Sequence, residues 1–375
     1  MHKSNLHPTH WLICAQVSNI SKHPSDRYFG TWLTLFDDFA DFVESGGLEL
    51  AATACAHFLP ALDWVSDPRT GDVLVNDVRR YEGFHAAGIA AALTFTRLDA
   101  GERRPFYTRG PRPESYREDL ELTENLSGEA AEALWRNIRA AAESGWDFSS
   151  RWLRGDGLET IRTRDIIPVD LNAFLYKAER RLAAFYARLG RQDDAARFAE
   201  KARTRRDLMN ATFWDPARKR WRDVLKDGTY ASLGPSLSDY APLWAGIGPP
   251  DGDVAGLVEN LEASGLVREF GVQATCATTG EQWDAPNAWP PLVDMLVEGL
   301  LGLDHDGASQ LARSIGTAWL ASVKAGFEAS GAFFEKYDAD ARGKRGAGGE
   351  YEPQDGFGWT LGAAAAMVER FHCDV

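Results

Sequence analysis

The sequence predicts an all-α protein built from antiparallel helical hairpins. Apolar residues recur at helical spacing, most clearly over residues 171–189, where they follow the i, i+3, i+4, i+7 pattern of one buried helix face. Gly190 ends this segment, and a second helical stretch at 193–212 follows almost at once, so the two form a hairpin. Strand-like alternation is hard to find, which favours helical hairpins without a strict repeat period.

The remaining helices are predicted on both sides of this hairpin. Helical patches lie at 32–43 and 81–95, while the first 25 residues show little pattern. We therefore expect a disordered start over 1–25 and a single domain over 26–375. Five further helices are predicted at 128–143, 254–264, 290–303, 309–329 and 361–371.

Composition excludes several classes of protein. The chain has 375 residues, of which 44% are apolar and 26% charged, as in a globular protein. A formal net charge of −14 repels nucleic-acid backbones and anionic lipid, so neither is an expected partner. The longest apolar runs are far shorter than the roughly 18 residues that a membrane helix needs, and no membrane association is expected.

The termini and cysteines bear on the compartment. The apolar patch at 11–15 is shorter than the roughly 7 to 15 residues of a secretory signal, so a cytoplasmic location is expected. A periplasmic location stays open if the natural start of the chain lies further upstream. The 4 cysteines are widely spaced with no C-x-x-C pair, which argues against a zinc site and a disulfide scaffold.

Loops dense in Trp, Gly and Asp separate the helices. In a chain of antiparallel hairpins, alternate loops emerge at the same end, so we expect them to converge on one rim. Asp170 and Thr360 are candidate caps of the helices that follow them, and Pro290 and Pro291 suit a first helical turn. The loops are 143–152, 168–172, 281–291 and 346–360.

Four carboxylates in or beside these loops adjoin aromatic residues. They are Asp147, Asp284, Glu335 and Glu350. Apolar neighbours desolvate a carboxylate and raise its pKa, as a general acid near neutral pH requires. The alternative for each is a structural role, as a helix cap or the partner of an arginine. The chain also holds 13 Trp, whose ring faces stack on sugars, so the pattern favours a two-carboxylate carbohydrate hydrolase.

Other chemistries lack their motifs. The sequence contains no phosphate-binding GxxxxGK[ST], no dinucleotide-binding GxGxxG after a strand, no HExxH and no GxSxG. The 8 histidines never pair at i, i+4, so a histidine-based metal or nucleophile site is not expected.

The order of the loop motifs resembles the α,α-trehalase family of inverting glycoside hydrolases. The resemblance covers residues 107–360, about two thirds of the chain, and QWDAPNAWPP has Ala288 where glycine is usual. The motifs are PRPES (111–115), ESGWDFSSRW (143–152), IIPVDLN (166–172), QWDAPNAWPP (282–291), FEKYD (334–338) and GGEYEPQDGFGWTLG (348–362).

The resemblance implies an (α/α)6 toroid-type barrel, incomplete at its N-terminal end, that hydrolyses trehalose. Asp147 would be the general acid and Glu335 the general base, standing about 6.5 to 9.5 Å apart to admit a water molecule. Arg112 and Glu114 would grip the glucose under attack, and Glu350 would hold the second glucose. It implies no metal and no organic cofactor. The substrate-binding residues it implies are Arg112, Pro113, Glu114, Gly145, Trp283 and Glu350.

The N-terminal region departs from the family pattern. Neither the P-G-G-R-F-x-E-x-Y-x-W-D motif nor the R-S-Q motif is present, and residues 25–29 only echo the first. We therefore expect this chain to hydrolyse trehalose poorly or not at all. Two alternatives remain open: a degenerate, non-catalytic relative of trehalases, and a hydrolase of another α-glucoside.

Overall fold

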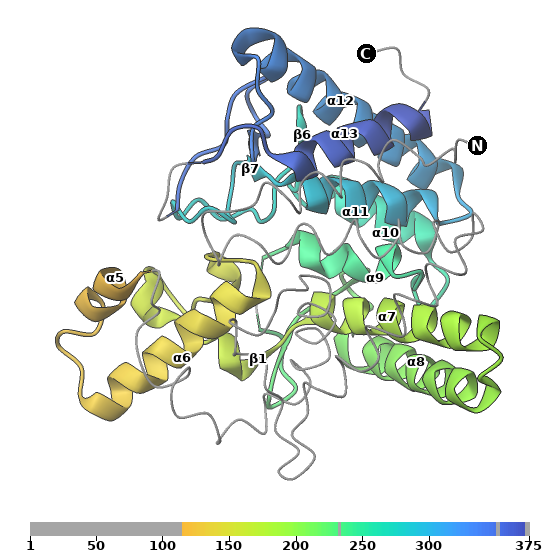
Figure 1. The fold of residues 1–375 in the computed structure, drawn as a ribbon, viewed down its shortest axis with the longest axis horizontal. Helices are drawn as coiled ribbons and strands as arrows, with labels where there is room; N and C mark the ends of the chain where they lie inside the picture. Colours follow the sequence, from red (N-terminus) through yellow and green to blue (C-terminus); the bar gives the residue numbers. More distant parts are fainter. Residues whose placement is uncertain (1–114, 232–233, 350–352, 372–375) are drawn as a thin grey trace, which may run out of the picture. The chain divides into compact units, whose positions relative to one another are not determined.

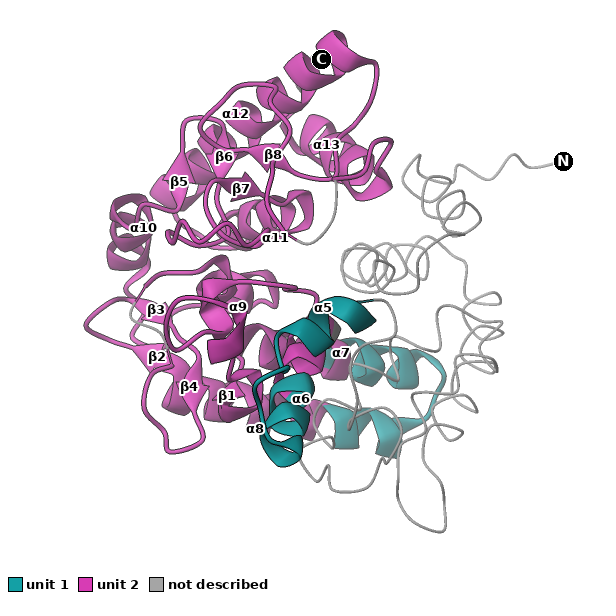
Figure 2. Cartoon of the chain, turned by 90° about the vertical axis from the view of Figure 1, so that its left-hand side faces the viewer, with its two compact units in different colours: residues 1–136, 180–198 teal, residues 137–179, 199–375 magenta. Residues whose placement is uncertain are grey.

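The computed structural model describes residues 115–231, 234–349 and 353–371 (Figure 1). Within these ranges the chain divides into two compact units (Figure 2). The described part of unit 1 comprises residues 115–136 and 180–198, and unit 2 holds the rest. The disordered start predicted for 1–25 and the helices predicted at 32–43 and 81–95 lie outside the described residues, and the single-domain assignment stays a prediction.

Helices dominate the described residues, which confirms the all-α class. Residues 171–189 and 193–212 form a helical hairpin, as expected, with Gly190 at φ 73° in the connection. The α-helices are α5 (Tyr116–Glu121), α6 (Gly128–Ser144), α7 (Val169–Arg188), α8 (Gln192–Phe213), α9 (Ala241–Trp244), α10 (Val254–Ala263), α11 (Pro290–Leu301), α12 (Asp306–Ser330) and α13 (Gly358–Phe371). The short helices α5 and α9 were not predicted, because one or two turns hold too few residues to show a period.

Strands within the described ranges are confined to antiparallel pairs of two residues each. Such short ladders fasten loops to each other rather than forming a layer of the fold. The pairs are β1 (Ile166–Ile167) with β4 (Val224–Leu225), β2 (Trp214–Asp215) with β3 (Arg220–Trp221), β5 (Val267–Arg268) with β6 (Gly271–Val272), and β7 (Asn287–Ala288) with β8 (Tyr337–Asp338).

The two predicted helix caps, Asp170 and Thr360, are wrong, whereas the predicted first turn is confirmed. Pro290 and Pro291 open α11 as expected. Asp170 instead lies inside the first turn of α7, where its carboxylate pairs with Arg151. Thr360 lies inside α13 and donates its hydroxyl hydrogen to the carbonyl of Phe334. Both helices begin before the predicted caps, α7 at Val169 and α13 at Gly358, so each residue lies in the first turn and also bonds a residue distant in sequence.

Helix α11 lies at the centre of unit 2, where it contacts α9, α12 and α13 (Figure 1). Its residues from Pro290 to Leu300 are buried except Asp294 and Glu298, as expected for a helix enclosed on most sides. Both of these acids face Arg370 of α13. No helix in the described ranges combines the length and apolar character needed to span a bilayer.

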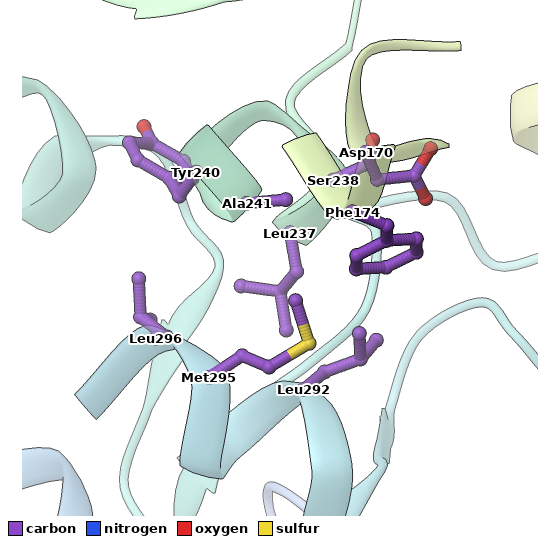
Figure 3. Close-up of a pocket in the computed structure, with 9 residues that line it drawn as sticks. All are labelled: Asp170, Phe174, Leu237, Ser238, Tyr240, Ala241, Leu292, Met295 and Leu296. Carbon is purple, nitrogen blue, oxygen red and sulfur yellow. The ribbon is translucent and has the colours of Figure 1, made fainter. Parts of the chain in front are cut away.

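A small cavity lies between α7, α9 and α11 within unit 2 (Figure 3). Its volume of about 10 Å³ is close to the least that one water molecule needs, and far too small for a sugar. The candidate acid Asp147 and base Glu335 do not line it. The lining residues are Asp170, Phe174, Leu237, Ser238, Tyr240, Ala241, Leu292, Met295 and Leu296.

The close approach of α11 to α9 depends on a glycine. A Cβ placed on Gly299 would lie 2.7 Å from the Cβ of Leu243 and 2.7 Å from the backbone nitrogen of Trp244. Because backbone cannot move aside like the end of a side chain, we expect Gly299→Ala to destabilise the protein by about 1 to 3 kcal/mol. Urea unfolding followed by circular dichroism measures the change.

Gly362→Ala is the matched control. Gly362 lies within α13, and a Cβ there meets no heavy atom within 4 Å. Its replacement should stabilise the helix by roughly 0.5 to 1 kcal/mol, because alanine loses less conformational freedom than glycine. Equal stabilities for the two variants would contradict this account of the α9–α11 contact.

Candidate active site

The candidate acid Asp147 follows directly on the end of α6. Gly145 has φ 82°, a left-handed conformation that glycine adopts without steric cost, and it turns the chain out of the helix. The side chains of Trp146 and Phe148 are buried, while Asp147 between them is half-buried. Its carboxylate therefore lies where the aromatic core of unit 2 meets its surface.

Two consecutive residues of a distant loop hold the backbone around Asp147. The side-chain amide of Gln282 donates a hydrogen bond to the carbonyl of Asp147. The backbone nitrogen of Trp283 donates to the carbonyl of Phe148 at 3.0 Å. The QWDAPNAWPP segment thus fixes the position of the main chain that carries the candidate acid.

Asp284 fastens the same two loops from within the core. Its carboxylate is fully buried and accepts hydrogen bonds from the backbone nitrogen of Ser150 and from four hydroxyls. These come from Ser149 at 2.9 Å, Ser150 at 2.8 Å, Thr275 at 2.7 Å and Thr279 at 2.5 Å. Of the two roles considered for this carboxylate, the contacts support the structural one, although its partners are hydroxyls and not an arginine.

Four indoles cluster beside these loops. The ring of Trp283 stacks on Trp146 at 5.2 Å and on Trp289 at 3.9 Å between ring centroids. The ring of Trp359 meets Trp289 edge-on at 5.6 Å. Trp283, predicted to bind substrate, is only 3% exposed. Its ring contacts join the indole beside Asp147 to Trp289, just before the start of α11.

The candidate base Glu335 is held by residues 354–359, where the chain enters α13. Its side chain is buried, and one carboxylate oxygen accepts a hydrogen bond from the backbone nitrogen of Gln354 at 3.4 Å. Its own backbone nitrogen donates to the carbonyl of Gln354 at 3.0 Å. Its carbonyl accepts from the indole nitrogen of Trp359 at 2.7 Å. Glu335 is thus fixed by the stretch that leads into α13.

Lys336 is a site residue that the sequence analysis missed. Its side chain is buried, and its ammonium donates to the Gln282 side-chain oxygen at 3.2 Å and to the Gly348 carbonyl at 3.3 Å. Burial lowers the pKa of Lys336 to about 8, and the charges of Glu335 and Asp147 partly oppose this fall. Both candidate catalytic carboxylates therefore act on one ammonium. The only signal in the sequence was its place beside Glu335 in FEKYD.

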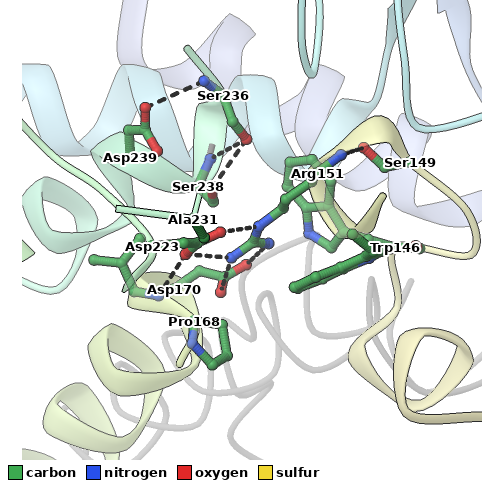
Figure 4. Close-up of polar contacts among 12 residues, drawn as sticks. Trp146, Ser149, Arg151, Pro168, Asp170, Asp223, Ala231, Ser236, Ser238 and Asp239 are labelled. Carbon is green, nitrogen blue, oxygen red and sulfur yellow. Dashed lines mark hydrogen bonds and ion pairs between the residues drawn. The ribbon is translucent and has the colours of Figure 1, made fainter. Parts of the chain in front are cut away.

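Arg151 is a second buried cation that the sequence analysis missed (Figure 4). Its guanidinium forms two hydrogen bonds to Asp170, both at 2.7 Å, and two to Asp223 at 2.6 and 2.9 Å. Burial by itself lowers the pKa of Arg151, but the two carboxylates outweigh it and raise the pKa above its ordinary value. The guanidinium lies 4.8 Å from the ring centroid of Trp146, the residue before Asp147. The ion pairs of Arg151 with Asp170 and Asp223 therefore support the loop that carries Asp147.

The expected convergence of the loops is confirmed within the described residues. Hydrogen bonds join residues 147–150 to 282–284, 335–336 to 354 and 282, and 151 to 170. Of the predicted site residues, this region contains Gly145, Asp147, Trp283 and Glu335. Arg112, Pro113, Glu114 and Glu350 lie outside the described residues. No group of three or more potential metal ligands occurs in the part of the chain that the structure describes.

Comparison with known proteins assigns this chain to a family. A profile of the Trehalase family matches residues 91–372. Trehalase from Homo sapiens is 38% identical over 267 residues, covering 70% of this chain and 46% of that protein. Trehalase from Pimpla hypochondriaca is 40% identical over 277 residues, covering 70% of this chain and 47% of the relative. The chain belongs to the trehalase family, and it spans about half the length of these curated relatives.

A solved structure supports the fold class. Neutral trehalase Nth1 from Saccharomyces cerevisiae superposes with a TM-score of 0.51 at 19% identity, covering 78% of this chain and 58% of the other. At this identity the likeness concerns the fold alone. It confirms the (α/α)6 toroid-type class that the sequence resemblance implied.

We expect Arg151→Met to destabilise the protein by about 3 to 5 kcal/mol, because it leaves the carboxylates of Asp170 and Asp223 buried without their counter-charge. Arg154→Met is the matched control three residues away. Arg154 pairs with Asp165, but both side chains are at least half exposed, so its loss should cost less than about 1 kcal/mol. Urea unfolding of both variants makes the comparison, and similar losses would contradict it.

Proposed function

We propose that this chain hydrolyses α,α-trehalose to two glucose molecules with inversion at the attacked carbon. Its membership of the trehalase family supports this substrate. The observation that carries the proposal is the set of hydrogen bonds from Lys336, the neighbour of Glu335, to the Gln282 side chain and from that side chain to the Asp147 carbonyl, since it ties together the two distant motifs that hold the carboxylates. Two carboxylates flanking the scissile bond are the requirement for this chemistry.

In this mechanism the two carboxylates have opposite tasks. Asp147 donates its proton to the glycosidic oxygen as the bond from that oxygen to the anomeric carbon breaks. Glu335 removes a proton from a water molecule, whose oxygen attacks the same carbon from the opposite face. The two carboxylates are held by different loops: Asp147 is half-buried between Trp146 and Phe148. Glu335 is buried and accepts a hydrogen bond from the Gln354 backbone.

The remaining roles follow the family resemblance. Arg112 and Glu114, with Pro113 between them, contact the glucose under attack, and Gly145 presents its backbone to it. Glu350 binds the second glucose. Gly145 lies two residues before Asp147, at a turn that leaves no side chain between the backbone and an approaching ligand. For Trp283 we propose a role as support for the site through its stacking on Trp146, in place of direct sugar binding.

Poor or absent turnover of trehalose stays a prediction. Loss of two or three hydrogen bonds to the sugar would raise the barrier by about 3 to 9 kcal/mol. Measurement of kcat/KM with trehalose and with other α-glucosides tests this and also separates the two alternatives. A chain that binds sugar without turnover would be a non-catalytic relative.

We expect Asp147→Asn and Glu335→Gln each to lower kcat by about 10²-fold or more, because each removes a proton-transfer group. Release of glucose from trehalose measures the loss, and circular dichroism checks the fold. Asp340→Asn is the matched control, since Asp340 forms a half-exposed ion pair with Arg268 outside the site. Loss of turnover in this control would point to a general effect on the fold.

The stereochemistry of the product gives a separate check. Inversion converts the attacked ring into β-glucose and leaves the departing ring as α-glucose, so equal amounts of the two should form first. Proton NMR during the first minutes, before the anomers interconvert, distinguishes them. Early product consisting only of α-glucose would rule out the inverting mechanism.

A further inference from the structure

Gln282 is a buried side chain whose two polar ends meet the two loops that carry the candidate catalytic residues. The nitrogen of its side-chain amide donates a hydrogen bond to the carbonyl of Asp147. The oxygen of the same amide accepts a hydrogen bond at 3.2 Å from the ammonium of Lys336, the residue after Glu335. Gln282 is only 1% exposed, so it is too deeply buried to bind a substrate itself.

The chemistry of its two partners fixes which way the amide of Gln282 faces. A backbone carbonyl only accepts hydrogen bonds, and a lysine ammonium only donates them. The amide nitrogen must therefore face Asp147, and the amide oxygen must face Lys336. A half-turn of the amide would bring two acceptors together and two donors together, and would break both bonds. Only a side chain that carries a donor and an acceptor side by side can join these two groups.

The surroundings of Gln282 leave its side chain little freedom to move. Its backbone carbonyl accepts a hydrogen bond from the indole nitrogen of Trp289 at 2.9 Å. The backbone of the glycine-rich loop packs directly against its side chain, since a Cβ placed on Gly349 would lie 2.7 Å from its Cβ and 2.7 Å from its Oε1. Gly349 has φ 88° and donates its backbone hydrogen to the carbonyl of Gly280 at 3.0 Å. The amide is therefore held as a rigid link between its two partners.

We infer that Gln282 is a positioning residue that sets where the main chain of Asp147 lies relative to the Glu335–Lys336 segment, through both ends of its amide. The inference rests on the proposed function for the roles of the two carboxylates. Inversion requires an acid and a base held about 6.5 to 9.5 Å apart, so that one water molecule fits between them. Misplacement of a catalytic group by about 1 Å can lower the rate by about 10²-fold. The amide of Gln282 is thus one determinant of that spacing.

The first test detects the link without any sugar. Cell-free synthesis with ¹³C-carbonyl aspartate and ¹⁵N-phenylalanine limits the carbonyl-to-amide NMR signals to the 3 Asp-Phe pairs of the sequence, and Asp147→Asn identifies the one of interest. Lys336→Met should shift this signal in the otherwise unmodified protein and leave it nearly unchanged in the Gln282→Met background. Lys336→Arg, which keeps the positive charge, provides a second and milder perturbation. An equal shift in both backgrounds, or none in either, would overturn the inference.

The second test compares two buried glutamines by kinetics. Gln273 is also buried, and its side-chain amide donates at 2.8 Å to the carbonyl of Gly265, outside the candidate site. Gln282→Met and Gln273→Met each remove a hydrogen bond of this kind, so both should lower the melting temperature. Only Gln282→Met should lower kcat, by about 10-fold or more, with KM changed by less than about 3-fold. Equal kcat values for the two variants would contradict a positioning role.

The variant Gln282→Glu separates positioning from packing. Glutamate has nearly the shape of glutamine, and its carboxylate still accepts from Lys336 but has no hydrogen to donate to the carbonyl of Asp147. We expect a loss of kcat comparable to that of Gln282→Met, because the bond to the acid's loop is lost in both. An unchanged kcat would mean that Gln282 only fills space, and would refute the inference.

The two tests separate the inference from the proposed function. If the unmodified protein releases no glucose from trehalose, the proposed function fails, and the carbonyl signal of Asp147 alone decides whether Gln282 links the two loops. If trehalose is hydrolysed but the Gln282 variants keep their kcat, the proposed function stands and the role of Gln282 is refuted.

Discussion

The candidate site depends on the buried carboxylate of Asp284. Its hydrogen bonds to Ser149, Ser150, Thr275 and Thr279 fasten the loop that follows α6 to the loop that precedes α11. Each hydrogen bond to a charged group contributes roughly 1.5 to 3 kcal/mol, and removal of the carboxylate would leave several buried donors without an acceptor. The position of Asp147 relative to the core is therefore set by an acid that takes no part in the proposed reaction.

Two buried cations, Arg151 and Lys336, differ in their hydrogen-bond partners and in the direction in which their pKa values are shifted. Arg151 forms four hydrogen bonds to two carboxylates, which holds it permanently charged and makes it a fixed support. Lys336 has neutral acceptors in Gln282 and Gly348, and burial brings its pKa to about 8. Two carboxylates thus hold the charge of Arg151 in the core, whereas burial brings the pKa of Lys336 closer to neutral pH.

Much of the helical framework was predictable from local pattern. The bounds of α6, α7, α8 and α11 follow the apolar spacing of residues 128–143, 171–189, 193–212 and 290–303 to within about two residues. Side chains on one helix face lie three or four residues apart, so their burial is recorded in the sequence itself. The capping roles predicted for Asp170 and Thr360 failed because α7 and α13 begin before them, and each residue also bonds a partner far away in the chain.

The site divides along the same line. The sequence by itself placed the carboxylates of Asp147 and Glu335 beside aromatic residues. Its antiparallel helical hairpins also indicated that alternate loops emerge at the same end of the fold. Tertiary structure alone decided that Asp284 is a fastening point and that Trp283 is packed between two other indoles. It also decided that Lys336 donates to the Gln282 side chain, which in turn donates to the Asp147 carbonyl. The physical reason is that a desolvated charge acquires its role from groups that converge on it through space, and these groups come from segments up to nearly 190 residues apart.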